Sequence, residues 1–194
     1  MVKSEKSENV ALILLAAGTS SRFKSEKLTA FLKGKRLLQW AIDSLGPLEL
    51  EKILVVKPGF PLGLFSTDGF RVVVNYDYRT GIASSVKAGL KSIDPRSEGL
   101  VLTLGDMPYI ERRDVERLLA EAPRGREMTA FAFQGAKGFP TFVPRELFPE
   151  LSKIEGDRGA FALVKEGIAN FRSIRGEKRH TVDIDLPEDI EGKS

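Results

Sequence analysis

The segment at residues 15–27, LAAGTSSRFKSEK, combines small residues, hydroxyls and positive charge directly after an apolar run. Arg22 and Lys27 on such a loop could straddle a triphosphate and neutralise charge on its leaving group. The small residues before them would let backbone amides approach an anion. The alternative is a small-residue turn with solvated charges, and the residues alone leave both interpretations open.

The same segment resembles a phosphate loop of the G-x-x-x-x-G-K-[ST] type but departs from it at one fixed position. From Gly18 it reads GTSSRFKS, with Phe23 where the second glycine lets the backbone wrap a β-phosphate. The following residues, SEKLTAFLKGK, do not form the strong helical pattern that such a loop opens into. We therefore expect a different device for binding phosphate.

Three carboxylates are candidate metal ligands. Asp106 directly follows an apolar run and is turned by Pro108, so its carboxylate could reach a magnesium ion. It could equally be a turn residue or the N-cap of a helix at 111–121. Asp183 and Asp185 are two apart on an expected strand, so both would face the same side and repel unless a cation or solvent separated them. An exposed edge strand is the alternative.

Composition excludes several chemistries. The chain has no cysteine, which removes disulfides, thiolate zinc sites and cysteine nucleophiles. The single histidine, His180, argues against a histidine-ligated metal, and we expect it to lack the serine and aspartate partners of a triad. Magnesium is therefore the expected metal. A net charge of +3 without a basic block does not favour nucleic-acid binding.

The first half of the chain alternates strand and helix patterns. The apolar, β-branched runs predict strands covered on both faces, at residues 10–16, 52–57, 71–75 and 100–105. Helical spacing of apolar residues predicts helices at 36–45, 81–93 and 111–122. This alternation is typical of an α/β fold with three layers and a doubly wound, mainly parallel sheet, which is Rossmann-like.

The second half is less regular. We predict strands at 128–133, 138–144 and 180–186, and helices at 145–151 and 157–167. We expect one domain over 1–194, with 1–9 as a disordered lead-in. There is no apolar run near 20 residues and no secretory signal pattern, so we expect a cytoplasmic protein with no membrane partner.

Ligands of such sheets bind beyond the carboxyl ends of the strands, which selects further polar residues. Asn75 ends the third strand, and Gly81 with the Ser84–Ser85 pair opens a helix whose free N–H groups could meet a phosphate or a base edge. Asp157, in GDRGA, could cap the following helix or close over a second substrate.

In order, these motifs resemble those of the MobA-like nucleotidyltransferases, in the branch that includes molybdenum cofactor cytidylyltransferase. The family opens with L-A-[AG]-G-x-S-x-R-[MF]-G-x-x-K, which residues 15–27 match in register through Lys27. The later matches are GKRLLQW (34–40), Asn75 with Gly81 and Ser85, GDMP (105–108), GFP (138–140), GDRGA (156–160) and DIDLPED (183–189). The resemblance covers nearly the full length.

The resemblance implies a role for each motif. The residues implied in nucleotide binding are Leu15, Ala16, Ala17, Gly18, Arg22, Lys27, Asn75, Gly81 and Ser85. Arg22, Lys27 and Asp106 would be catalytic, and Asp106 would hold Mg²⁺ with one or both of Asp183 and Asp185. Gly138, Pro140 and Asp157 would lie on the acceptor side. The acceptor's phosphate would attack the α-phosphorus in line and expel pyrophosphate, so positioning and charge neutralisation would carry the rate.

Four residues depart from the family pattern. Lys24 replaces a usual glycine, and Phe31 and Arg36 replace common prolines, which we expect to alter loop shape rather than chemistry. Phe139 fills a position often held by His or Asn, on the acceptor side, so it puts the identity of the acceptor in doubt.

The functional hypothesis is a magnesium-dependent transfer of a nucleoside monophosphate from CTP or GTP to molybdopterin or a related phosphorylated cofactor. Ala17 and the paired aspartates of DID favour the cytidylyl branch over the guanylyl branch. The alternatives are a sugar- or polyol-phosphate nucleotidyltransferase and a nucleotide-binding regulator without turnover. A molybdoenzyme or chaperone that receives the product would be a protein partner.

Overall fold

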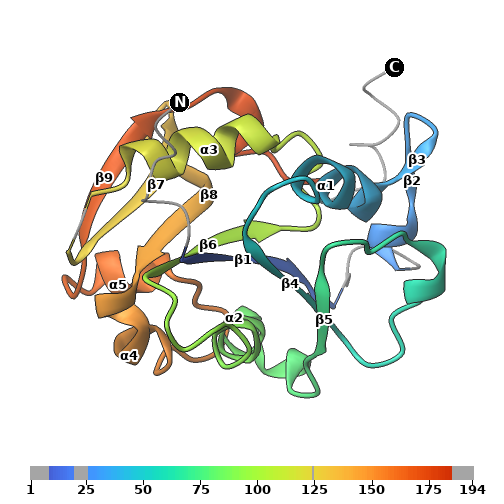
Figure 1. Ribbon diagram of the computed structural model, residues 1–194, viewed down its shortest axis with the longest axis horizontal. Coiled ribbons are helices and arrows are strands. Elements are labelled where there is room, and N and C mark those ends of the chain that lie inside the picture. The colour runs from blue at the N-terminus through green and yellow to red at the C-terminus, as the bar shows by residue number, and fades with distance from the viewer. Residues whose placement is uncertain (1–8, 20–25, 124, 185–194) are drawn as a thin grey trace.

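The computed structural model describes residues 9–19, 26–123 and 125–184. Seven strands form one sheet in the order β5-β4-β1-β6-β8-β7-β9 (Figure 1). Their bounds are β1 Val10–Ala16, β4 Glu51–Val56, β5 Arg71–Val74, β6 Gly99–Leu104, β7 Glu127–Phe133, β8 Ala136–Pro144 and β9 Asn170–Arg175. The pairs β1–β4, β1–β6, β4–β5 and β7–β9 are parallel, whereas β8 is antiparallel to both of its neighbours. The mainly parallel sheet is the one predicted.

Helices cover both faces of this sheet, giving three layers (Figure 1). Helices α1 (Leu37–Leu45) and α3 (Arg112–Glu121) pack on one face. Helices α2 (Ile82–Leu90), α4 (Phe148–Leu151) and α5 (Phe161–Lys165) pack on the other. A small antiparallel hairpin, β2 (Phe31–Leu32) with β3 (Lys35–Arg36), precedes α1. Single 3-10 turns are η1 Lys27–Thr29, η2 Leu62–Leu64, η3 Tyr78–Thr80, η4 Arg145–Leu147 and η5 Lys178–His180.

Strand β1 shows why an unbroken apolar run predicts this arrangement. Leu12 and Leu14 face the α1–α3 side, Ile13 faces the α2 side, and all three are fully buried. Because alternate side chains of a strand point to opposite faces, a strand covered on both sides needs apolar residues at every position. Truncating one of these leucines to alanine would cost about 2–5 kcal/mol.

The chain order brings the carboxyl ends of β1 and β6 together. From β1 the chain moves outward to β4 and β5, and α2 then returns it to β6 on the other side of β1. Leu15 of β1 pairs in register with Leu104 of β6, and the Gly105 N–H donates to the Leu15 carbonyl at 2.9 Å. The strand order reverses here, which is where open α/β sheets bind their ligands.

Two local predictions are wrong, and one strand was missed. The described part of the strand predicted at 180–186 is not a strand: His180 ends η5, and 181–184 pair with no strand. The last strand is instead β9, which was missed because only Phe171 and Ile174 of NFRSIR are apolar and they do not alternate. The helix predicted at 157–167 begins at Phe161, so Asp157 is not its cap.

No helix within the described ranges is long and apolar enough to cross a membrane. The predicted lead-in at 1–9 lies outside the described residues except for Asn9, whose carbonyl accepts the Glu98 N–H at 2.7 Å.

Candidate active site

Lys27 and Asp106 meet at the carboxyl edge of the sheet. The Lys27 Nζ lies 2.7 Å from Asp106 Oδ2, and their side chains are 12% and 19% exposed. Lys27 opens the η1 turn, which is anchored by buried Leu28, while Asp106 directly follows Gly105 at the end of β6. The structure thus joins two of the three residues predicted to be catalytic. The third, Arg22, lies outside the described residues.

The second oxygen of Asp106 is suited to a cation. Asp106 Oδ1 is buried and has no hydrogen-bond partner among the described residues. A buried carboxylate oxygen without a partner is costly, and a hard divalent cation would satisfy it. The alternative that Asp106 caps α3 is wrong, because Glu111 occupies the N-cap and forms a capping box with Asp114.

The segment that carries Asp183 lies against Asp106. The Ile184 N–H donates to the Asp106 backbone carbonyl at 3.0 Å, and the Ile184 side chain is buried in the core beside α1 and α3. Asp183 is exposed, and Asp185 falls outside the described residues. Within the described ranges no group of three potential metal ligands occurs. Of the three predicted metal ligands, Asp106 and Asp183 lie within the described residues.

The residues predicted to approach the nucleotide change from buried to exposed along the chain. Leu15, Ala16 and Ala17 are buried, whereas Gly18 is exposed and has open space where a Cβ would lie. The rest of this loop, residues 20–25, is outside the described ranges, and so is the departure at Lys24.

Lys57 is a charged residue at this edge that the sequence interpretation missed. It directly follows β4, and its Nζ lies 3.2 Å from the Gly18 carbonyl oxygen and 2.5 Å from Glu26 Oε2. Lys57 therefore contacts both ends of the 18–26 segment. The rule that places ligands beyond strand ends would have selected Lys57, because it is the last residue of the apolar run KILVVK.

Asn75 joins β5 to the start of α2. It is buried, and its Nδ2 donates to the hydroxyls of Ser84 at 2.8 Å and Ser85 at 3.0 Å. Its Oδ1 accepts the Asp77 N–H at 3.0 Å. Asn75, Ser84 and Ser85 thus satisfy one another, so the structure gives them a role in fixing the first turn of α2.

Gly81 and the GDRGA motif pack together. A Cβ on Gly81, which has a φ of 108°, would lie 2.2 Å from the carbonyl carbon of Gly156 and 2.7 Å from the Asp157 nitrogen. The Ala83 N–H donates to the Gly156 carbonyl at 3.1 Å. The prediction that the first N–H groups of α2 are free is therefore wrong for Ala83, because a protein carbonyl uses it.

The residues expected on the acceptor side come from two places. Gly138 and Pro140 are buried in β8, and a Cβ on Gly138 would lie 2.1 Å from the His180 carbonyl oxygen. Asp157 is exposed and lies beside Gly81. The described contacts thus place Gly138 against His180 and Asp157 against Gly81.

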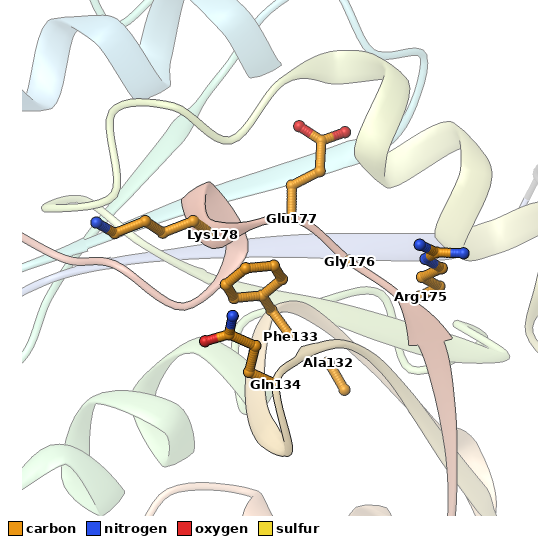
Figure 2. A pocket seen from close by; sticks show the side chains of 7 residues that line it. All are labelled: Ala132, Phe133, Gln134, Arg175, Gly176, Glu177 and Lys178. Atoms are coloured by element: carbon orange, nitrogen blue, oxygen red, sulfur yellow. The ribbon is translucent and has the colours of Figure 1, made fainter.

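A pocket of about 460 Å³ lies at the end of β7 and β9 (Figure 2). Because β9 is parallel to β7, and β7 runs with β6, this pocket opens at the same edge of the sheet as Asp106. Phe133, at the end of β7, and Gln134, in the β7–β8 turn, lie opposite the segment that follows β9. Its lining residues are Ala132, Phe133, Gln134, Arg175, Gly176, Glu177 and Lys178.

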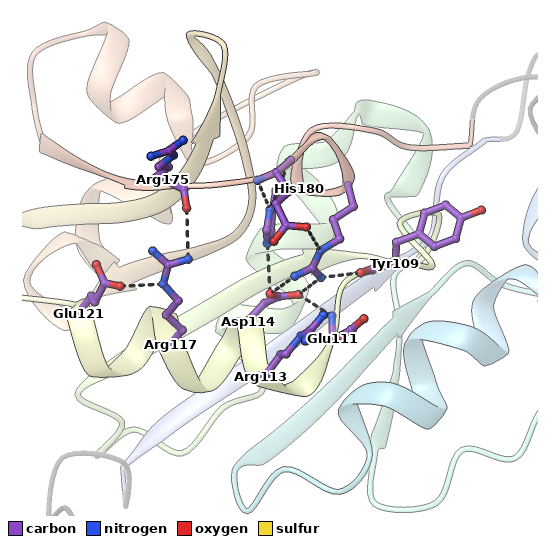
Figure 3. A network of polar contacts seen from close by, with 10 residues as sticks. Tyr109, Glu111, Arg113, Asp114, Arg117, Glu121, Arg175 and His180 are labelled. Atoms are coloured by element: carbon purple, nitrogen blue, oxygen red, sulfur yellow. Dashed lines mark hydrogen bonds and ion pairs between the residues drawn. The ribbon is translucent and has the colours of Figure 1, made fainter.

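His180 belongs to a buried charge network (Figure 3). Its Nε2 lies 3.2 Å from Asp114 Oδ1, and its ring stacks on Phe131 with centroids 4.1 Å apart. Burial raises the pKa of Asp114, but hydrogen bonds from His180 and Arg179 outweigh this effect and lower the pKa to about 2. The expectation that His180 has no aspartate partner is wrong. Among its described contacts there is no serine.

The comparisons with known proteins agree with this architecture. The family model of the MobA-like NTP transferase domain matches residues 12–172. Purine catabolism protein PucB of Bacillus subtilis (strain 168) is 27% identical over 192 residues, which cover 92% of this chain and 93% of PucB. A probable molybdenum cofactor guanylyltransferase of Natranaerobius thermophilus is 26% identical over 118 residues, which cover 59% of this chain and 55% of that protein.

Solved structures share the fold over nearly the whole chain. The homologue of Mycobacterium tuberculosis Rv0371c from Mycobacterium sp. strain JC1 has a TM-score of 0.81 and 28% identity, covering 94% of this chain and 93% of its own. The fold and site define an α/β nucleotidyltransferase. The chain belongs to the MobA-like NTP transferase family, as its motifs predicted.

Proposed function

We propose that this protein transfers a nucleoside monophosphate from a nucleoside triphosphate to the phosphate of a small-molecule acceptor, with a divalent metal, Mg²⁺, held at Asp106. The observation that carries the proposal is the pairing of one Asp106 oxygen with Lys27, while the other oxygen is buried with no hydrogen-bond partner among the described residues. A cation and an unsatisfied carboxylate at the switch point of the sheet are the groups that a metal–triphosphate complex requires.

The bound metal would neutralise charge on the phosphates and orient them. The chain's own groups complete the reaction. An oxygen of the acceptor's phosphate attacks the α-phosphorus, the bond from this phosphorus to the β-bridging oxygen breaks, and pyrophosphate leaves. No covalent nucleophile is needed. Lys27 stabilises the negative charge that develops on the leaving pyrophosphate, and Asp106 with Asp183 would hold the cation.

The acceptor proposed first is molybdopterin or a related phosphorylated cofactor, with CMP as the transferred group. Ala17 and the aspartate pair around Ile184 favour cytidylyl transfer. Guanylyl transfer is the second candidate, because the Natranaerobius relative is named a probable guanylyltransferase. Arg22, Asp185 and the acceptor-side residues Gly138, Pro140 and Asp157 remain proposed site residues. A molybdoenzyme or a chaperone of one is the proposed recipient of the product.

Pyrophosphate release tests these proposals. The protein is incubated with Mg²⁺, one nucleoside triphosphate at a time, and a panel of phosphomonoesters that includes molybdopterin and sugar and polyol phosphates. Release with CTP and molybdopterin supports the full proposal. Release with GTP moves the base choice to guanylyl transfer, and release only with a sugar or polyol phosphate overturns the cofactor acceptor. No release with any pair would support a nucleotide-binding regulator instead.

A further inference from the structure

Arg179 connects its own turn after β9 to the chain between β6 and α3, which lies 65 to 70 residues earlier in the sequence. Its guanidinium donates to both oxygens of Asp114, with Nη2 2.7 Å from Oδ1 and Nη1 2.5 Å from Oδ2. Nη1 also donates to the Tyr109 backbone carbonyl at 2.9 Å. Tyr109 lies three residues after Asp106, and Asp114 lies in the first turn of α3. Arg179 therefore contacts the chain between Asp106 and the first turn of α3 at two points, the Tyr109 carbonyl and the Asp114 carboxylate.

The chain after Arg179 leads directly to the candidate metal site. His180 is held between Phe131 and Asp114, and its carbonyl packs against Gly138. Four residues later, the Ile184 N–H donates to the Asp106 carbonyl. The 181–184 segment is thus fixed at both ends, and Asp183 lies within it.

Stability alone does not explain this arrangement. Asp114 is 4% exposed, and a buried ion pair recovers its desolvation cost only with good geometry. A well-packed apolar contact could attach the segment at least as strongly. The two-pronged guanidinium–carboxylate contact, in contrast, fixes both distance and orientation.

We propose that Arg179 is a positioning residue for the metal site: by clamping Asp114 and the Tyr109 carbonyl, it sets where the Asp183 segment lies relative to Asp106. The proposal rests on the proposed function, since it assigns the cation to Asp106 and Asp183. Arg179 itself touches neither substrate nor metal. Mutating residues that hold metal ligands in place without contacting the metal typically changes metal affinity by 10- to 100-fold.

Arg179→Lys is the informative variant. Lysine keeps the positive charge, but it cannot donate two parallel hydrogen bonds to the carboxylate as the planar guanidinium does. Arg117→Lys is the matched control. Arg117 also connects α3 to the C-terminal part of the chain, since it pairs with Glu121, donates to the Arg175 carbonyl at 3.2 Å and lies over the Phe131 ring. Among the described residues, no hydrogen bond or ion pair joins it to Asp114 (Figure 3). Asp114→Asn serves as a second variant with nearly unchanged shape if Arg179→Lys does not fold.

Binding of Mn²⁺ alone to each full-length protein is measured from the electron paramagnetic resonance signal of the free ion. Hydrogen exchange of the peptide containing Ile184 is followed in parallel. Relative to wild type, we expect Arg179→Lys to raise the Kd for Mn²⁺ about 10- to 100-fold and to speed exchange of this amide. Turnover should then recover at high Mn²⁺, with the KM for the nucleotide changed far less. Arg117→Lys should behave as wild type.

The two proposals can fail separately. If wild type binds Mn²⁺ and releases pyrophosphate but folded Arg179→Lys does so with the same metal dependence, the positioning role is overturned and the proposed function stands. The same applies to Asp114→Asn when it is the folded variant. If wild type neither binds Mn²⁺ nor releases pyrophosphate with any substrate pair, the proposed function is overturned, and the positioning role with it.

Discussion

Lys27 and Asp106, 79 residues apart in the sequence, form a 2.7 Å ion pair, and the other carboxylate oxygen of Asp106 is buried with no hydrogen-bond partner in the described part of the chain. The Lys27 ammonium therefore satisfies only one of the two carboxylate oxygens of Asp106. A metal ion at the free oxygen would weaken the hold of Asp106 on Lys27, whose ammonium could then turn to the triphosphate. Under the proposed function, metal binding and triphosphate binding would thus be coupled through one carboxylate.

Asp106→Asn should abolish metal-dependent turnover. Asparagine preserves the shape of the side chain but removes the negative charge that a divalent cation requires. Pyrophosphate release is measured over a series of Mg²⁺ concentrations, with thermal unfolding to verify the fold. Asp43→Asn is the matched control, because Asp43 also pairs with a lysine, Lys35, but lies on exposed α1 surface. Normal turnover in the Asp106 variant would place the metal elsewhere.

Lys27→Met should have opposite effects on binding and turnover. Without a nucleotide, Mn²⁺ should bind Asp106 more tightly, since the competing ammonium is gone. Turnover should fall about 10²- to 10³-fold, the usual loss for one preorganised electrostatic contact in a transition state. Mn²⁺ titration and pyrophosphate release measure the two quantities, and Lys35→Met should alter neither. Weaker Mn²⁺ binding in the Lys27 variant would contradict the competition.

Lys57→Met should raise the KM for the nucleoside triphosphate about tenfold, an effect of roughly 1.4 kcal/mol that matches one lost charged hydrogen bond. The Lys57 ammonium contacts the Gly18 carbonyl and Glu26, so removing the ammonium loosens both ends of the 18–26 segment, which is proposed to bind the nucleotide. Steady-state kinetics at saturating metal and acceptor measure the change. The KM for the acceptor should stay near the wild-type value, and an equal rise in both would indicate a general loss of structure.

The strand–helix alternation in the first half could be predicted because those strands are apolar at nearly every position. Strand β9 could not, since it is largely exposed and only Phe171 and Ile174 are apolar. Its place is set by pairing with β7 rather than by its own residue pattern.

Asp106 and Lys27 were likewise predictable, because each belongs to a motif at a strand end or in the loop after one. The Arg179–Asp114 clamp was not, since it joins an ordinary charged helix face to a turn 65 residues away, and only the folded chain shows that Asp114 is buried and Arg179 largely covered. Gly81 and Gly138 were predicted as ligand residues, yet the structure shows a packing reason for each.

Acid should destabilise the fold partly through Asp114. Its pKa is about 2 in the folded protein and near 3.9 in an unfolded chain. Because the folded value is the lower, its stabilisation is present above about pH 4 and is lost as the pH falls through about 2. The loss amounts to about 2 kcal/mol.

Urea unfolding at pH 5, 3 and 2 measures this loss. Wild type should lose about 2 kcal/mol more than Asp114→Asn over this range, although the variant starts from a lower stability because Arg179 loses its charged partner. Asp94→Asn is the control: the pKa of Asp94 is also lowered to about 2, but it pairs with Arg96 on the surface, where solvent screens the interaction. Equal slopes for wild type and Asp114→Asn would show that Asp114 is not the group responsible.

Gly81→Ala separates a packing role from a ligand role at a residue predicted to bind nucleotide. An alanine Cβ would overlap the Gly156 carbonyl and would hold a φ of 108°, which L residues rarely adopt. The 156–157 segment would have to move and release the Ala83 N–H. We expect the free energy of unfolding to fall by about 1–3 kcal/mol without any nucleotide present.

Gly63→Ala provides the comparison, because a Cβ at Gly63 meets nothing within 4 Å. Chemical denaturation of the free protein, followed by nucleotide titration of the folded variants, distinguishes the two roles. If Gly81 acts by packing, the stability loss appears without nucleotide, and weaker nucleotide binding accompanies it only as far as the start of α2 is displaced. Unchanged stability with lost nucleotide binding would instead assign Gly81 to direct contact with the ligand. The close approach of Gly156 would then follow from the backbone conformation that Gly81 adopts for the ligand.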